Sequence, residues 1–120
     1  MTVTVTYASQ VQLSDGTRLQ QFDGRSFQHT LTKFGFGPGL VTIGATEEVI
    51  DFGDLDPGFV MIENLSADYP VEIGPESGGV MIPMHSIPAG QSDRFFRKAG
   101  VTIRAQGIGG SVDVQINAME

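Results

Sequence analysis

The sequence predicts an all-β protein, either an antiparallel β-sandwich or a jelly roll, with an N-terminal hairpin or extended arm. Three observations predict this fold. Short segments alternate apolar and polar residues with a period of two, as half-buried strands do. Sixteen glycines and six prolines separate these segments with frequent turns. No long segment shows the apolar spacing of three and four residues that is typical of an amphipathic helix.

The N-terminal part of the chain differs from the rest. TVTVTY, at residues 2–7, alternates Thr with Val and Tyr, and β-branched residues suit a pleated surface. Residues 8–39 alternate less clearly and contain two Asp-Gly turns and a Gly-Pro-Gly stop. We therefore expect residues 1–39 to form a hairpin of the same domain or an extended arm that packs on a neighbour. Residues 40–120 should form the sandwich domain.

Further segments of strand character follow, nearly all bounded by Gly, Pro, Asp or Asn. They are residues 26–36, 40–44, 47–52, 58–64, 71–74, 79–83, 93–97, 101–105 and 111–118. A helical turn is an alternative only near SDRFFRKAG, where Phe95 and Phe96 suit a strand as well. In the last segment, SVDVQINA, the alternation places Val112, Val114 and Ile116 on one face.

Composition excludes several classes of protein. Fourteen acidic residues against seven basic ones give a net charge of −7, which argues against binding to nucleic acid phosphates. The absence of cysteine excludes disulfide frameworks and thiolate metal sites. The N-terminus lacks the pattern of a signal peptide, and no apolar run is long enough for a membrane helix. We expect neither a nucleic acid nor a membrane as partner.

Charge is unevenly distributed along the chain. Residues 47–76 contain nine acidic residues and no basic one, whereas residues 94–104 contain four basic residues and no acidic one. These segments form either two solvated faces of one sandwich or complementary surfaces for neighbouring copies. For the second case, the candidate interaction residues are Arg94, Arg97, Lys98, Arg104, Glu47 and Glu48.

The acidic segment DFGDLDPGF is the one candidate metal site, because clustered carboxylates bind hard cations. It supplies Asp51, Asp54 and Asp56. An EF-hand that starts at Asp54 would need glycine where Phe59 stands and glutamate where Leu65 stands. A polar turn that enters a strand is therefore the preferred interpretation, and we expect no cofactor.

The glycine-rich segments do not match catalytic motifs. VEIGPESGG, at residues 71–79, has no lysine for a phosphate loop, and Pro75 stands where a serine nucleophile elbow needs glycine. His29 and His85 are the only histidines, so the clustered histidines of a cupin-like metalloenzyme are missing. We expect no enzymatic activity. The segment should instead be a turn in which Gly78 or Gly79 adopts positive φ and Glu76 points into solvent.

The methionines Met61, Met81 and Met84 lie in apolar segments with no accompanying cluster of cysteine or histidine ligands. Filling of the core is their expected role.

Residues 58–96 combine several short motifs in a fixed order. An aromatic strand, Phe59–Ile62, leads through Asn64–Leu65 and a polar turn into a V-x-I-G strand, Val71–Gly74. The Gly-rich turn Ser77–Gly79 and the Pro-x-Gly turn Pro88–Gly90 then precede an Arg-Phe strand at Arg94–Phe95. This order of motifs resembles that of small structural proteins of tailed bacteriophages. The likeness extends over roughly residues 40–118.

The resemblance implies a non-enzymatic virion protein, assembled in the host cytoplasm. Within the virion it favours a capsid decoration (cement) protein that forms a homo-oligomer, preferably a trimer, and binds the major capsid protein between capsomers. A tail, head-tail joining or fibre-associated module is the first alternative. A carbohydrate-binding jelly roll is another, with Tyr69, Asp68, Glu72 and Glu76 as candidate contacts.

Overall fold

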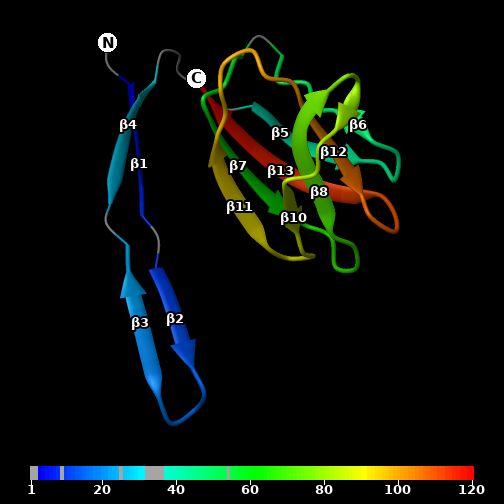
Figure 1. Ribbon diagram of the computed structural model, residues 1–120. Coiled ribbons are helices and arrows are strands. Elements are labelled where there is room, and N and C mark those ends of the chain that lie inside the picture. Colours follow the sequence, from blue (N-terminus) through cyan, green and yellow to red (C-terminus); the bar gives the residue numbers. More distant parts are fainter. Residues whose placement is uncertain (1–2, 9, 25, 32–36, 54) are drawn as a thin grey trace. The chain divides into compact units, whose positions relative to one another are not determined.

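The computed structural model describes residues 3–8, 10–24, 26–31, 37–53 and 55–120. These residues are all-β: their strands pair antiparallel, and they contain no helix (Figure 1). The predicted fold class is confirmed. The chain divides into two units, residues 1–34 and 35–120.

The first unit, here called the hairpin arm, is a β-hairpin in two successive parts (Figure 1). Strand β1 (Val3–Tyr7) pairs with β4 (Phe27–Leu31), and β2 (Gln10–Ser14) pairs with β3 (Leu19–Asp23). Residues 15–18 connect β2 to β3, and the Asp15 N–H donates to the Arg18 carbonyl at 3.2 Å, so Gly16 and Thr17 form a two-residue loop. Gly16 has a φ of 91°, which suits the first central position of a type II′ turn, where L side chains are disfavoured.

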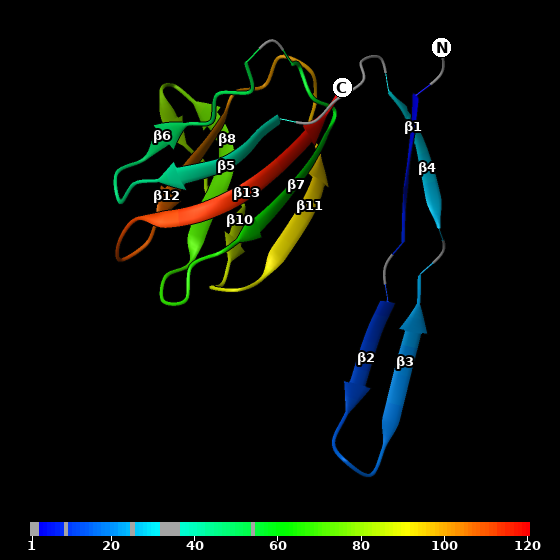
Figure 2. The same ribbon diagram turned by 180° about the vertical axis from the view of Figure 1, so that it is seen from behind.

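The second unit consists of two packed antiparallel sheets, seen from opposite sides in Figures 1 and 2. The first sheet contains, in spatial order, β11 (Ser92–Phe96), β7 (Phe59–Asn64), β13 (Val112–Met119) and β5 (Gly37–Ile43). The second contains β10 (His85–Ile87), β8 (Val71–Ser77), β12 (Ile103–Gly107) and β6 (Glu48–Val49), while β9 (Val80–Met81) pairs with β8.

The connections between these strands are those of a jelly roll. The chain crosses from one sheet to the other at every connection except from β8 through β9 to β10. The pairings are nested: β5 pairs with β13, β6 with β12, β7 with β11, and β8 with β10. Two interlocked Greek keys of this kind define the jelly roll.

Branched aliphatic side chains fill the space between the sheets. Along β13, alternate residues are buried, among them Val112, Val114 and Ile116, as the alternation predicted. Val60 and Ile62 of β7 pack into the same core. Removal of this apolar surface from water is the main stabilising contribution to the unit.

Several local expectations need correction. The boundary predicted at residue 39 falls inside β5, which begins at Gly37. Residues 92–96 form strand β11, as the strand pattern of residues 93–97 predicted, and not the alternative helical turn. Met81 is buried as expected, but core filling is wrong for Met84, whose surface is 68% exposed, and Met61 is also exposed.

The VEIGPESGG segment forms all of β8 and the two-residue turn of a tight hairpin to β9. Ser77 pairs with Val80, and both residues between them have positive φ, 61° at Gly78 and 81° at Gly79. Two successive positive φ values are the signature of a type I′ turn, which only glycine and a few polar residues adopt readily. The predicted role of these glycines is confirmed.

Candidate functional site

An ion-pair cluster links the acidic and basic segments within one chain. Arg104 of β12 lies between two carboxylates: its Nε is 2.7 Å from Glu47 Oε1, and its Nη1 is 2.8 Å from Glu76 Oε1. Glu47 Oε1 also accepts the Met81 N–H at 2.7 Å. The expectation that Glu76 points freely into solvent is wrong, because pairing of β8 with β12 brings it to Arg104.

Arg97 forms a second internal cluster. Its side chain is 7% exposed, its Nη1 lies 2.6 Å from Asp56 Oδ1, and its Nε donates to the Val101 carbonyl at 2.7 Å. The guanidinium also lies over the Phe52 ring, 5.6 Å from the centroid. Arg97 therefore connects Asp56, in the segment before β7, with Val101, in the segment after β11.

Some of the candidate interaction residues form contacts within the jelly roll, and others are exposed. Arg97, Arg104 and Glu47 form contacts inside the jelly roll, so a contact with a neighbouring copy would compete with these ion pairs. Arg94 and Lys98 are exposed. Glu48 is half-buried, and its Oε2 accepts the Gly44 N–H at 3.2 Å. An intermolecular role for these residues stays a prediction.

Among the described residues of the acidic segment 51–56, the carboxylates do not lie around a common point. Asp51 Oδ1 accepts the N–H of Gly53 at 2.8 Å, a local turn contact. Asp56 pairs with Arg97 and accepts the Gly100 N–H at 3.1 Å. Asp54 lies outside the described residues. Among the described residues, no group of three His, Cys, Asp or Glu side chains could hold a metal ion.

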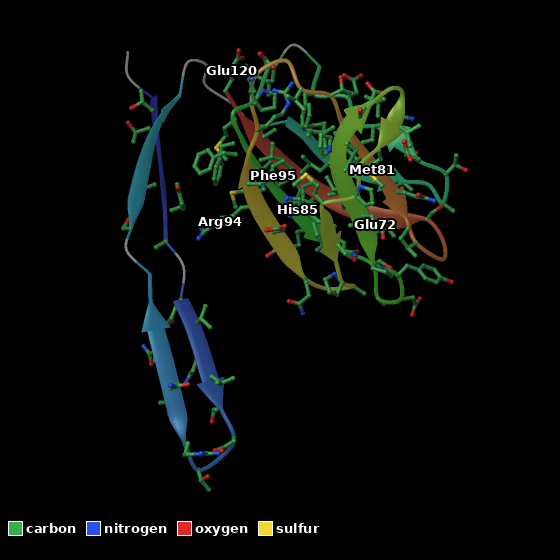
Figure 3. All side chains as sticks on the ribbon, in the orientation of Figure 1. Glu72, Met81, His85, Arg94, Phe95 and Glu120 are labelled. Atoms are coloured by element: carbon green, nitrogen blue, oxygen red, sulfur yellow. The ribbon has the colours of Figure 1, made fainter. Side chains whose placement is uncertain are left out.

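His85 and Asp93 connect the two sheets at one open side of the jelly roll. His85 Nδ1 of β10 lies 2.7 Å from Asp93 Oδ2 of β11, and the imidazole stacks on Phe95 with centroids 5.2 Å apart (Figure 3). A largely apolar cleft of about 210 Å³ adjoins this pair and reaches Lys98. General-base chemistry would also require a nucleophile within hydrogen-bond reach of the imidazole. The observed contacts hold the β10 and β11 edges together.

Tyr69, a candidate sugar contact, packs on the β12–β13 loop. A Cβ atom at Gly110 would lie 2.6 Å from the Tyr69 ring, and one at Gly109 would lie 2.9 Å from it. The ring therefore lies directly against the glycine backbone, which leaves less of it for stacking on a sugar.

The hairpin arm carries a surface that composition alone did not reveal. Every residue of β2 is exposed, and so is Leu19 at the start of β3. Val11, Leu13 and Leu19 are 60%, 66% and 60% exposed, respectively. Alternation of Val11 and Leu13 with polar residues within QVQLS was the available signal.

The arm ends in a polar turn. Asp15 Oδ1 accepts the backbone N–H groups of Arg18 at 2.7 Å and Thr17 at 3.0 Å, and Asp15 Oδ2 lies 2.8 Å from Arg18 Nη2. The Arg18 and Thr17 N–H groups, followed by the Arg18 side chain, lower the pKa of Asp15 from 3.8 to about 2. This network neutralises the charges at the turn.

No protein family model, curated protein or solved structure matches the chain. The described residues include no helix that is long and apolar enough to span a membrane.

Proposed function

We propose that the protein is a non-enzymatic structural component of a tailed-phage virion, and specifically a capsid decoration protein. It would stabilise the head by binding between capsomers, with itself and the major capsid protein as partners. The observation that carries this proposal is the hairpin arm, a unit of its own that exposes aliphatic side chains along β2 and β3. Val11 and Leu13 lie on the same face of β2, and apolar side chains exposed together in this way are typical of surfaces that a partner covers.

The construction of the jelly roll is consistent with an assembly role. Its core is filled by aliphatic residues, and two of its arginines are used for internal ion pairs. A scaffold of this kind presents surfaces and sheet edges, and extended strands can bind through main-chain hydrogen bonds. The resemblance of residues 40–118 to phage structural proteins supplies the virion context. High copy number on a symmetric shell would multiply weak contacts by avidity.

Cosedimentation with phage heads tests this proposal. Purified protein is mixed with heads assembled from the major capsid protein of the phage that encodes it, and the heads are separated on a density gradient. We expect saturable binding and a higher temperature of head disruption. Protein that remains at the top of the gradient at every concentration would refute decoration. Binding to isolated tails under the same conditions would support the tail or head-tail alternative.

A further inference from the structure

The β2–β3 part of the hairpin arm needs a further strand. A two-stranded hairpin alone is at best marginally stable in water, and three or more strands are needed for independent stability. Here the pair exposes three large aliphatic side chains: Val11 and Leu13 on one face, and Leu19, which pairs with Ser14, on the other. A third strand at one of its edges would bury part of this surface.

The edges of the jelly roll are protected against such pairing. At the β10 edge, the three residues 82–84 face the two residues 74–75 of β8, and this bulge includes Pro83. At the β11 edge, Asp93 lies opposite buried Ile62. Opposite residues share a face of the sheet, so the Asp93 carboxylate is on the face that packs toward the core. Strand β6 has two residues, and β5 contains Pro38. Bulges, prolines, inward charges and short strands are the usual means of preventing edge-to-edge association.

The hairpin arm lacks these protections in β2 and β3. The strands QVQLS and LQQFD contain no proline, lysine or arginine, and their one charged residue is Asp23 at the end of β3. At the turn, Asp15 and Arg18 neutralise each other. The register between β2 and β3 is regular, without a bulge. The protein therefore leaves one of its long strand pairs open to pairing.

Charge indicates which surfaces of two copies can meet. Residues 1–34 contain three basic and two acidic residues, whereas residues 35–120 contain four basic and twelve acidic ones. Two jelly rolls therefore repel each other, but two hairpin arms are nearly neutral. Contact between arms avoids the repulsion that contact between jelly rolls would encounter.

Strand β2 is complementary to itself. If two copies of QVQLS pair antiparallel about Gln12, Val11 of each copy faces Leu13 of the other, and Gln10 faces Ser14. Opposite residues share a face of the sheet, so the four aliphatic side chains form one apolar face. A shift by one residue would place aliphatic side chains on the glutamine face.

We propose that β2 strands from two copies pair edge to edge about a twofold axis at Gln12, forming a four-stranded intermolecular sheet. This inference rests on the proposed assembly function and names the partner of the arm as a second copy of the same chain. The association is carried by main-chain hydrogen bonds and the Val11–Leu13 face.

Disulfide trapping tests the register. The chain has no cysteine, so Gln12→Cys introduces a single thiol at the proposed twofold axis. Opposite residues of an antiparallel pair have Cα atoms about 4.5–5.5 Å apart, within the range of a disulfide. We expect oxidation to give a covalent dimer in high yield. Leu40→Cys on β5 is the matched control, because Leu40 is 68% exposed but lies on the jelly roll. Equal cross-linking of the two variants would overturn the proposal.

Mass measurement provides an independent test with two double variants. The wild-type chain should have twice the 12.8 kDa monomer mass by light scattering. Val11→Lys/Leu13→Lys places like charges opposite each other and should give monomers, while Val11→Lys/Leu13→Glu places opposite charges there and should retain the dimer. A wild-type monomer or trimer, or identical behaviour of both variants, would contradict twofold pairing.

These results are distinguishable from failure of the proposed function. A wild-type monomer that still binds heads would overturn the arm pairing alone. A wild-type dimer that cross-links through Gln12→Cys but never cosediments with heads would leave the pairing intact and refute decoration.

Discussion

Asn64 is the one polar residue among those described that is buried as a whole residue, with 0% of its surface exposed, and its replacement provides the sharpest test of how the jelly roll is held together. Its Nδ2 donates to the carbonyls of Tyr69 and Ile87, both at 3.0 Å, and its Oδ1 accepts the Ser66 N–H at 2.9 Å. One side chain at the end of β7 thus fixes the β7–β8 connection and the end of β10.

Asn64→Ala would leave two carbonyls and one N–H without their partner. Each lost hydrogen bond costs about 0.5–1.5 kcal/mol, so we expect a loss of about 3 kcal/mol in the free energy of unfolding. That loss is a large part of the ~5–15 kcal/mol available to a typical domain. With a urea m-value of about 1.5 kcal/mol/M, the unfolding midpoint should fall by about 2 M.

Urea unfolding followed by circular dichroism measures this change. Asn117→Ala is the matched control, because Asn117 is half-buried on the adjacent strand β13 and accepts a hydrogen bond only from the Gln115 side chain among the described contacts. It should cost about 1 kcal/mol or less. If the two variants unfold at the same urea concentration, the assignment of Asn64 as a central stabilising contact is wrong.

Three further predictions test other contacts. Gly74→Ala should prevent stable folding, because its Cβ would clash with the carbonyl oxygen of Ile82, whereas Gly58→Ala meets nothing within 4 Å and should remain folded by circular dichroism. Arg104→Met should lower the free energy of unfolding by about 2–4 kcal/mol, measured in urea, because it leaves two partly buried carboxylates unpaired. The depressed pKa of Asp15 stabilises the turn above pH 3.8, and this contribution is lost as pH falls through about 2. Amide chemical shifts of the arm turn should follow that titration, and Asp15→Asn should abolish it.

The sequence could predict what depends on local pattern. Alternation along SVDVQINA identified the buried face of β13, and paired glycines identified the turn at Gly78 and Gly79. Contacts set by strand order could not be predicted in this way. Glu47 and Arg104 are far apart in the sequence, and they meet only because β6 and β8 flank β12. The acidic and basic segments can be identified in the sequence. Their pairing within one chain could be recognised only once the order of the strands was known.

The burial of single residues could not be predicted from the sequence either. Met81 and Met84 lie in one short apolar segment, yet the first is buried and the second, which belongs to the bulge of residues 82–84, is exposed. Asn64 ends a strand and precedes a turn, which predicts an exposed residue. Its burial follows from the connections that fold over the end of β7.

Salt dependence separates the two kinds of interface considered for this protein. Pairing between the acidic segment and the basic residues of neighbouring copies would weaken as salt screens the attraction, with a Debye length of about 10 Å at 0.1 M and about 3 Å at 1 M. Pairing of β2 strands should behave in the opposite way, because salt screens repulsion between the acidic jelly rolls and leaves main-chain hydrogen bonds intact. We therefore expect the dimer dissociation constant, measured by analytical ultracentrifugation, to fall as sodium chloride is raised from about 0.1 to 1 M. A rise in that constant would identify charge pairing as the dominant contact and would contradict association through the hairpin arm.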